Sequence, residues 1–219
     1  MAPPPELSTV LVVSPHLDDA VLSAGQFLAG APGAVVVTML AGAPDPPVTT
    51  PWDLKSGFET SQEAIAARRA EDAAALALLK ATPVHLDFLD GQYAPVDSAA
   101  MAETLTELVA QHRPAFVVGP LGVHHCDHER VRDAVLAAEL DVPLWLYEDL
   151  PYRVYTPEAA AAAVETIRRR GYAMELGFIG SGPAASKTLA LWCYRSQMRH
   201  PEFDNIHSML VPERFWRVG

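Results

Sequence analysis

The stretch TVLVVSPHLDD, residues 9–19, decides the fold. Its first six residues form an apolar, partly β-branched run that ends at Pro15, which is the pattern of a strand buried on both faces. Residues 19–29 then have the apolar spacing of a helix. A buried strand that passes through a polar turn into a helix is typical of a parallel sheet covered by helices.

The same alternation continues through about 150 residues without a break in composition. Further strands are expected at 34–40, 83–89, 115–119 and 143–148, and further helices from Thr60 or Ser61 to about Lys80 and at 98–112, 127–140, 157–170 and about 183–199. We therefore predict one Rossmann-like α/β domain over residues 1–219, with a mostly parallel sheet of strand order 3-2-1-4-5 and helices on both faces. The proline-rich residues 41–60 are expected to form a binding loop or lid.

Composition limits the classes of partner. The 219 residues carry a formal net charge of −11, so phosphate backbones and anionic membranes are poor partners. No apolar run approaches the roughly 18 residues that span a bilayer. The two cysteines, Cys126 and Cys193, form no disulfide framework, which is typical of a reducing compartment. We expect a cytoplasmic protein that binds a small molecule and neither nucleic acid nor membrane; the oligomeric state stays open.

The polar residues that follow strands one and four are the candidates for chemistry. In a 3-2-1-4-5 sheet these two strands are neighbours at the point where strand order reverses, and ligands bind there. His16 and Asp19 follow strand one with a spacing of three, and His125 and His128 follow strand four with the same spacing. The rule for ligand binding in parallel sheets and the positions of these histidine and aspartate residues therefore select the same edge of the sheet.

These residue types suit a catalytic zinc ion. His16, Asp19 and His128 supply two imidazoles and one carboxylate, which leaves a fourth position open for water. Asp18 then lies beside the metal as a base for that water, and the spare His125 can stabilise an oxyanion or protonate a leaving amine. Asp127 can fix an imidazole tautomer by accepting its N–H. Fe²⁺ is an alternative metal for this ligand set.

Several alternatives stay open at this stage. His124 could take the place of His125, and Cys126 could be a ligand, although a neighbouring residue points elsewhere on a helix. Each of the two motifs alone is also compatible with a capped helix N-terminus. A structural zinc ion, or a metabolite-binding module without chemistry, are the remaining rivals; the latter lacks a glycine-rich phosphate motif after strand one.

At these residues the sequence resembles the PIG-L/LmbE family of zinc-dependent de-N-acetylases. The family has a His-Pro-Asp-Asp segment after its first strand and a later His-x-Asp-His segment; here they are His16-Leu17-Asp18-Asp19 and His125-Cys126-Asp127-His128. The resemblance implies His16, Asp19 and His128 as metal ligands, Asp18 as the base and His125 as the transition-state histidine. It also implies removal of an acetyl group from the amine of a glucosamine-like glycoside, or alternatively from a non-sugar thiol conjugate.

Weaker landmarks extend the resemblance over most of residues 9–198. Arg68 in Arg68-x-x-Glu71 and Asp90 in Phe88-Leu89-Asp90-Gly91 match positions where the family contacts substrate, while Tyr147-Glu148 and Lys187…Ser196-Gln197 match later segments. Arg68 is also compatible with a solvated pair to Glu71, and Asp90 with a turn. Independently of the family, segment 149–155 is expected to form a pocket wall with Arg153, Tyr152 and Tyr155 contacting substrate.

The sequence departs from the family pattern at three positions. Leu17 replaces the motif proline, Ala20 replaces a common acidic residue, and Val123 stands where some relatives have a tyrosine two residues before the transition-state histidine. None of the three is a metal ligand. The departures therefore bear on the identity of the substrate more than on the type of reaction.

Overall fold

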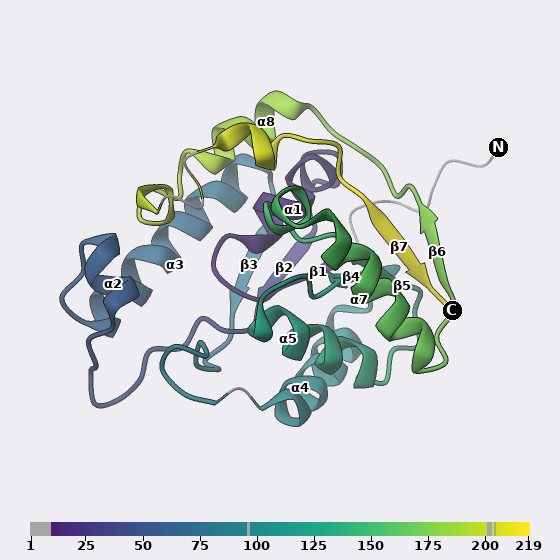
Figure 1. The fold of residues 1–219 in the computed structure, drawn as a ribbon, viewed down its shortest axis with the longest axis horizontal. Helices are drawn as coiled ribbons and strands as arrows, with labels where there is room; N and C mark the ends of the chain where they lie inside the picture. Colours follow the sequence, from purple (N-terminus) through teal and green to yellow (C-terminus); the bar gives the residue numbers. More distant parts are fainter. Residues whose placement is uncertain (1–9, 96, 201–202, 204) are drawn as a thin grey trace.

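A computed structural model describes residues 10–95, 97–200, 203 and 205–219 of the chain. It is built around a seven-stranded sheet of order β3-β2-β1-β4-β5-β7-β6 (Figure 1). The strands are β1 (Val10–Ser14), β2 (Val35–Thr38), β3 (Thr82–His85), β4 (Phe116–Pro120), β5 (Leu144–Tyr147), β6 (Met174–Gly177) and β7 (Phe215–Val218). The first five strands pair in parallel, so the predicted Rossmann-like sheet and its order 3-2-1-4-5 are confirmed.

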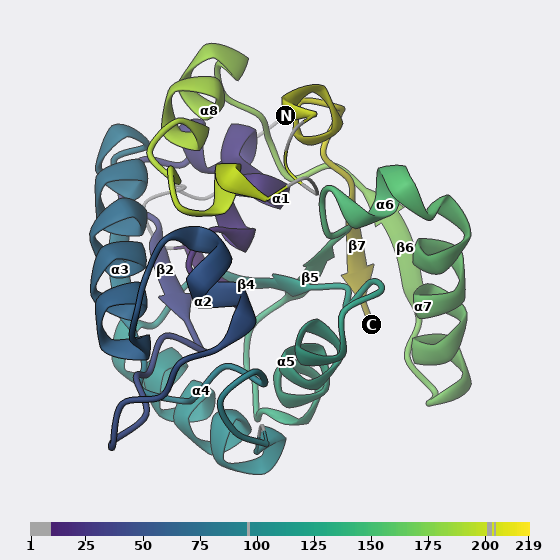
Figure 2. The ribbon, with the colours of Figure 1, turned by 60° about the vertical axis from the view of Figure 1, so that its left-hand side comes forward.

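Helices cover both faces of this sheet (Figures 1 and 2). They are α1 (Asp19–Ala29), α2 (Pro51–Ser56), α3 (Ser61–Leu78), α4 (Ser98–His112), α5 (Cys126–Ala137), α6 (Tyr152–Tyr155), α7 (Pro157–Arg169) and α8 (Ala184–Leu191), with short 3₁₀ helices η2 (Gln197–Arg199) and η4 (Ile206–Met209). Helices α1, α3 and α8 pack on one face, and α4, α5 and α7 pack on the other.

Strand β1 shows why its sequence has no polar alternation. Val10 and Val12 belong to the core beneath α1, α3 and α8, whereas Leu11 and Val13 belong to the core beneath α4, α5 and α7. Every residue of the strand is buried. A central parallel strand needs apolar side chains on both faces, and this requirement produces the continuous apolar run in the sequence.

The structure adds elements that the sequence pattern did not predict. Strands β6 and β7 extend the sheet, and β7 is antiparallel to both of its neighbours. Each has four residues and β6 is largely exposed, so neither has the long buried run that marked β1. Residues 41–60 are not loop throughout, because α2 begins at Pro51 behind a Thr50 cap. The helix expected at 183–199 ends at Leu191.

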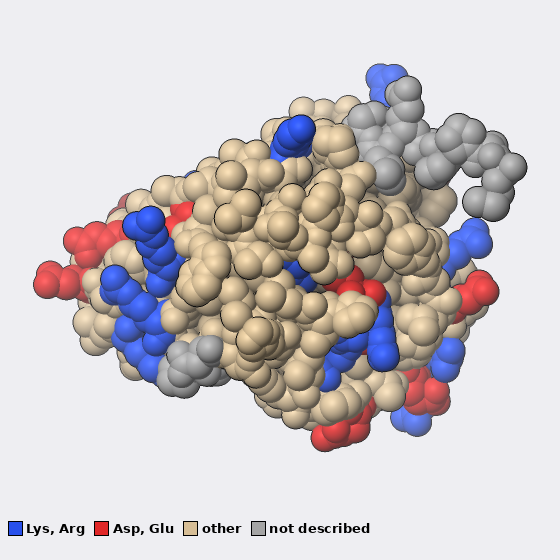
Figure 3. All heavy atoms as spheres, turned by 90° about the horizontal axis from the view of Figure 1, so that it is seen from above, with Lys and Arg blue, Asp and Glu red and all other residues tan. Residues whose placement is uncertain are grey.

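The charged side chains that the structure describes form no extended basic area in the view of Figure 3. In the face shown in Figure 3, the described lysine and arginine side chains lie in separate groups with acidic side chains between some of them, and no continuous basic field covers it. Within residues 10–95, 97–200, 203 and 205–219, no helix combines the length and the apolarity that crossing a membrane requires.

Candidate metal centre

The turn after β1 places His16 and Asp19 side by side. Ser14 donates its hydroxyl to the carbonyl of His16 at 2.7 Å and accepts the N–H of Ala20 at 3.0 Å, which closes the turn onto the start of α1. The backbone N–H of His16 donates to Asp19 Oδ2 at 2.8 Å. The carboxylate of Asp19 is therefore fixed by the same loop that carries the imidazole.

The turn after β4 presents the second pair of histidines. It passes through positive φ angles at Gly122 and at the non-glycine His124, and the buried Asp149 accepts the N–H groups of Gly122 and Val123 at 2.9 and 3.0 Å. The imidazole of His125 then caps α5, because its Nδ1 accepts the N–H of Asp127 at 3.2 Å. This cap leaves His128, in the first turn of α5, directed at Asp19.

His16, Asp19 and His128 come together, and we call these three residues the metal group. Their ligand atoms all lie within 4.8 Å of one another. Asp19 Oδ2 is 3.1 Å from His16 Nδ1 and 3.2 Å from His128 Nε2. His16, His125 and Asp127 form a second set within the same limit, and it shares His16 with the first.

The hydrogen bonds around the metal group decide which atoms face its centre. His16 Nε2 lies 3.3 Å from Asp127 Oδ2, and His128 Nδ1 lies 2.7 Å from Asp149 Oδ1. An imidazole N–H that is donated to a carboxylate leaves a lone pair on the other ring nitrogen. The inward atoms, His16 Nδ1 and His128 Nε2, are then both acceptors that face a carboxylate oxygen.

When both imidazoles are neutral in this tautomer, three acceptors converge on one point, and a cation between them stabilises this arrangement. His128 Nε2 is buried and makes no hydrogen bond of good geometry, although it is 3.2 Å from Asp19 Oδ2. Two imidazole nitrogens and one carboxylate oxygen are also the donor set of a zinc or non-haem iron site. The residues present therefore fit a divalent metal ion.

Burial and charge shift the pKa values of the group strongly. Burial lowers the pKa of His128, but Asp19 and Asp149 outweigh it and raise the value to about 9. Burial likewise opposes protonation of His16, yet Asp90, Asp127 and Asp19 raise its pKa well above the usual value. The pKa of Asp19 falls well below its usual range because His128 and His16 outweigh the effect of burial. The cluster thus favours positive charge at its centre.

Asp18 and His125 lie beside the metal group. Asp18 is buried, and burial together with the charge of Asp19 raises the pKa of Asp18 to about 7. The ring of His125 lies 5.2 Å from that of His16 and 5.0 Å from that of His128. Burial and the neighbouring His16 and His128 lower the pKa of His125 to about 4.

The other residues predicted to serve the site have different positions. Asp90 Oδ2 lies 4.0 Å from His16 Nε2 and also accepts from the Gln92 side chain, so Asp90 is at the rim. Arg68 is buried in an ion pair with Asp53 at 2.9 Å. Arg153 donates to the carbonyl of Pro212 at 2.7 Å and faces a separate cavity. Substrate contact by these three residues stays a prediction.

Two further residues complete the surroundings of the metal group. Asp149, which sequence reasoning left without a role, holds both His128 and the turn after β4; its position directly beyond β5 was the available signal. The ring of Tyr152, expected only as part of a pocket wall, lies 5.4 Å from that of His128 and 6.2 Å from that of His125. Val123, where some relatives have a tyrosine, is buried in the core.

The two residues that the sequence left as alternative site residues, His124 and Cys126, lie outside the metal group. His124 and Cys126 are exposed, and among the described residues neither belongs to a set of three side chains that could hold a metal ion. Asp127 is buried between the two loops and also accepts the N–H of Gly91 at 3.0 Å. A Cβ atom at Gly91 would collide with the Asp127 carboxylate, so glycine is required there.

A parallel sheet with a buried His-Asp-His group and an adjacent carboxylate beyond β1 and β4 defines the class of metal-dependent hydrolases that activate water. The PIG-L family model, described as GlcNAc-PI de-N-acetylase, matches residues 11–139, which is more than half of the chain. The chain therefore belongs to the PIG-L family of metal-dependent de-N-acetylases, and it is an N-deacetylase that hydrolyses a C–N bond.

Solved structures agree with this membership. Teicoplanin deacetylase Orf2 in its zinc-inhibited form is 27% identical with a TM-score of 0.79, over 96% of this chain and 97% of that chain. A triple mutant of the deacetylase from the teicoplanin pathway is 31% identical over the same shares, also at 0.79. The A40926 pseudoaglycone deacetylase Dbv21 is 29% identical over 97% of both chains, at 0.77. A comparison with curated proteins gave no match.

Proposed function

We propose that this deacetylase removes the acetyl group from the amine of a glucosamine-like unit in a small glycoside, with one zinc ion bound by His16, Asp19 and His128. The observation that carries the metal site is the convergence of three acceptor atoms on one buried point. The names of the similar structures support a sugar-containing substrate, since teicoplanin and A40926 deacetylases are among them. The free thiols of Cys126 and Cys193 support a cytoplasmic location.

The bound metal ion would supply a water of lowered pKa and a positive charge for the acyl oxygen. Asp18 takes the proton of the attacking water. Its carboxylate directly precedes Asp19 in the chain, and it is not one of the described residues that could hold the metal ion. Asp127 and Asp149 accept the outer N–H groups of His16 and His128, so the neutral form of each ring, which is the form that binds a metal ion, has its lone pair on the inward nitrogen.

The hydrogen bond at the start of α5 supports a role for His125 as a donor to the oxyanion. Its Nδ1 accepts the N–H of Asp127, so the ring proton is on Nε2. A ring in this tautomer donates a hydrogen bond to the oxyanion but has no second proton to release. The proton for the leaving amine then comes from Asp18, which holds it after the attack of water.

The test is metal content measured together with turnover. Purified protein is assayed for zinc and iron, and amine release is measured on N-acetylglucosamine glycosides and on N-acetylcysteine conjugates. We expect about one zinc per chain, turnover of the glycosides, and a fall in kcat of about 10²–10⁴-fold in Asp18→Ala with its metal retained. Asp18→Asn is the matched control of similar shape and should be equally slow.

Three results would contradict parts of this proposal. Asp18→Ala within threefold of wild type would remove Asp18 as the base. Turnover of the cysteine conjugates alone would replace the sugar substrate by the thiol-conjugate alternative. If the protein takes up neither zinc nor iron, the assignment of the metal group as metal ligands is wrong.

A further inference from the structure

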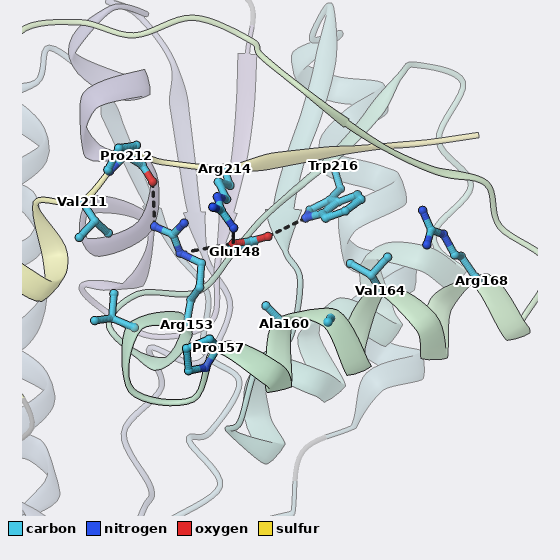
Figure 4. A pocket seen from close by; sticks show the side chains of 12 residues that line it. Glu148, Arg153, Pro157, Ala160, Val164, Arg168, Val211, Pro212, Arg214 and Trp216 are labelled. Carbon is cyan, nitrogen blue, oxygen red and sulfur yellow. Dashed lines mark hydrogen bonds and ion pairs between the residues drawn. The ribbon is translucent and has the colours of Figure 1, made fainter.

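A cavity of about 500 Å³ lies between α7, β7 and the segment that follows β5 (Figure 4). Its walls are largely apolar and include Val154, Ala160, Val164, Val211 and the ring of Trp216. This volume is within the range of small-molecule sites in proteins. The cavity contains none of the residues of the metal group.

Three arginine side chains and one carboxylate line this cavity, and two of the arginines contact the carboxylate. Glu148 Oε2 lies 3.3 Å from Arg153 Nε and 3.7 Å from Arg214 Nη1, and the guanidinium of Arg168 lies 5.9 Å from the centre of the Trp216 ring. Figure 4 shows Arg153 and Arg214 beside Glu148, whereas Arg168 lies beyond the Trp216 ring. Three positive charges against one negative charge leave a surplus of two, in a chain whose formal net charge is −11.

The polar groups are held in place by the fold. Glu148 is 3% exposed and accepts the indole N–H of Trp216 at 2.9 Å. Arg153 is fixed by the carbonyl of Pro212 at 2.7 Å, and Arg168 by the carbonyl of Met174 at 2.9 Å. Arg214, which is 57% exposed, stands at the mouth. The guanidinium groups of Arg153 and Arg168 are thus prearranged, which lowers the cost of ordering long side chains when an anion binds.

We propose that this cavity binds an organic carboxylate with a short apolar body. The guanidinium groups match a carboxylate, and the valine, alanine and indole walls match a hydrocarbon chain. The buried negative charge of Glu148 disfavours a dianion such as phosphate, which would also leave the apolar walls without a partner.

Helix α6 separates this cavity from the metal group. Its Tyr152 ring lies 5.4 Å from the ring of His128, whereas the next residue, Arg153, faces the cavity. The carboxylate can therefore belong to a distant arm of the deacetylase substrate or to a separate metabolite. Both sources share the same recognition chemistry.

The first test is calorimetric binding of octanoate to the metal-loaded protein. We expect saturable binding that is about tenfold weaker in Arg214→Ala and unchanged in Arg195→Ala, an exposed arginine of the loop after α8 that does not line the cavity. Octylamine and inorganic phosphate should bind at least tenfold more weakly than octanoate. Equal binding by octylamine or by phosphate, no binding of octanoate, or binding unaffected by Arg214→Ala would each overturn the proposal.

A second measurement identifies the source of the carboxylate, and this arm rests on the proposed deacetylase function. An apparent KM that rises with octanoate in wild type but not in Arg214→Ala assigns the cavity to a substrate arm. An unchanged KM, with octanoate still bound, assigns it to a separate metabolite. A rise that is equal in both proteins means that octanoate acts at the metal group, which contradicts the proposal while leaving the deacetylase function intact.

Discussion

Two buried polar clusters lie close to the functional end of the sheet, and they are built on opposite principles. The metal group brings together acceptor atoms that cannot satisfy one another. The second cluster, which we call the α2 cluster, joins α2 to α3 and to the C-terminal segment through complementary partners. Its members are Asp53, Ser56, Arg68, Tyr93 and His200.

In the α2 cluster each charge meets its opposite. Arg68 Nη2 is 2.9 Å from Asp53 Oδ1, and Tyr93 donates to Asp53 Oδ2 at 2.7 Å. Ser56 Oγ lies 2.7 Å from His200 Nε2. Complementary ion pairs hold elements of the fold together, whereas converging acceptors leave room for a cation.

The largest effect is expected when a metal ligand is removed. His128→Ala should lose the metal ion and lower amine release by about 10⁴-fold or more, because both the activated water and the charge at the acyl oxygen disappear. His124→Ala is the matched control, since its exposed ring lies outside the metal group. Elemental analysis and turnover check both variants. Loss of metal in His124→Ala, with retention in His128→Ala, would exchange the two assignments.

The next effect concerns stability and tests whether Arg68 is structural. Arg68→Met leaves Asp53 buried without its cation and should lower the free energy of unfolding by about 3–5 kcal/mol. The double variant Arg68→Met/Asp53→Leu should recover most of this loss, because no unpaired charge remains. Urea unfolding at pH 7 measures both variants. If Arg68→Met unfolds like wild type but has a raised KM, the residue serves the substrate instead.

Much of the sheet could be predicted because buried parallel strands carry a local signal. The run Val10–Ser14 is apolar on both faces, and the motifs after β1 and β4 meet because parallel strands place their carboxyl ends at one edge. Strand β7 carries no such signal. It lies near the C-terminus and pairs with β5 and β6. A short strand of this kind is specified by its partners more than by its own sequence.

The metal group could be predicted for the same local reason, but the pairs of the α2 cluster could not. His16 and Asp19 are three residues apart, so their proximity follows from one turn. The partner of Arg68 is Asp53, from a helix inside the proline-rich segment, and no sequence spacing links these two residues. The nearby Glu71 instead accepts from the backbone and side chain of Ser196. Long-range pairs of this kind are decided by packing.

A smaller effect is expected at the carboxylate behind the metal group. In Asp149→Asn the amide oxygen can still accept the N–H groups of Gly122 and Val123, but its NH₂ group faces His128 Nδ1 and favours the wrong tautomer. Metal affinity should fall about 10–100-fold. Competition with a chelator measures it, and Asp141→Asn on the exposed loop before β5 is the control. Unchanged affinity would mean that Asp149 acts only on the turn.

The smallest effect is a pH dependence of stability from the α2 cluster. His200 is fully buried, its ring stacks on Trp52 at 3.6 Å, and burial with the charges of Lys55 and Arg68 lowers its pKa to about 4. The unfolded chain, with a histidine pKa of about 6.5, takes up this proton first as the pH falls. The stability that neutral His200 contributes is therefore complete above pH 6.5 and is lost as the pH falls toward 4.

This dependence can be isolated by comparing wild type with His200→Gln. Between pH 7 and pH 5, wild type should lose about 2 kcal/mol more of its unfolding free energy than the variant, because the other titrating groups are common to both chains. Urea unfolding at the two pH values gives the difference. Parallel pH profiles would show that His200 takes up its proton without opening the cluster. The α2 cluster would then hold its elements together through Arg68 and Asp53 alone.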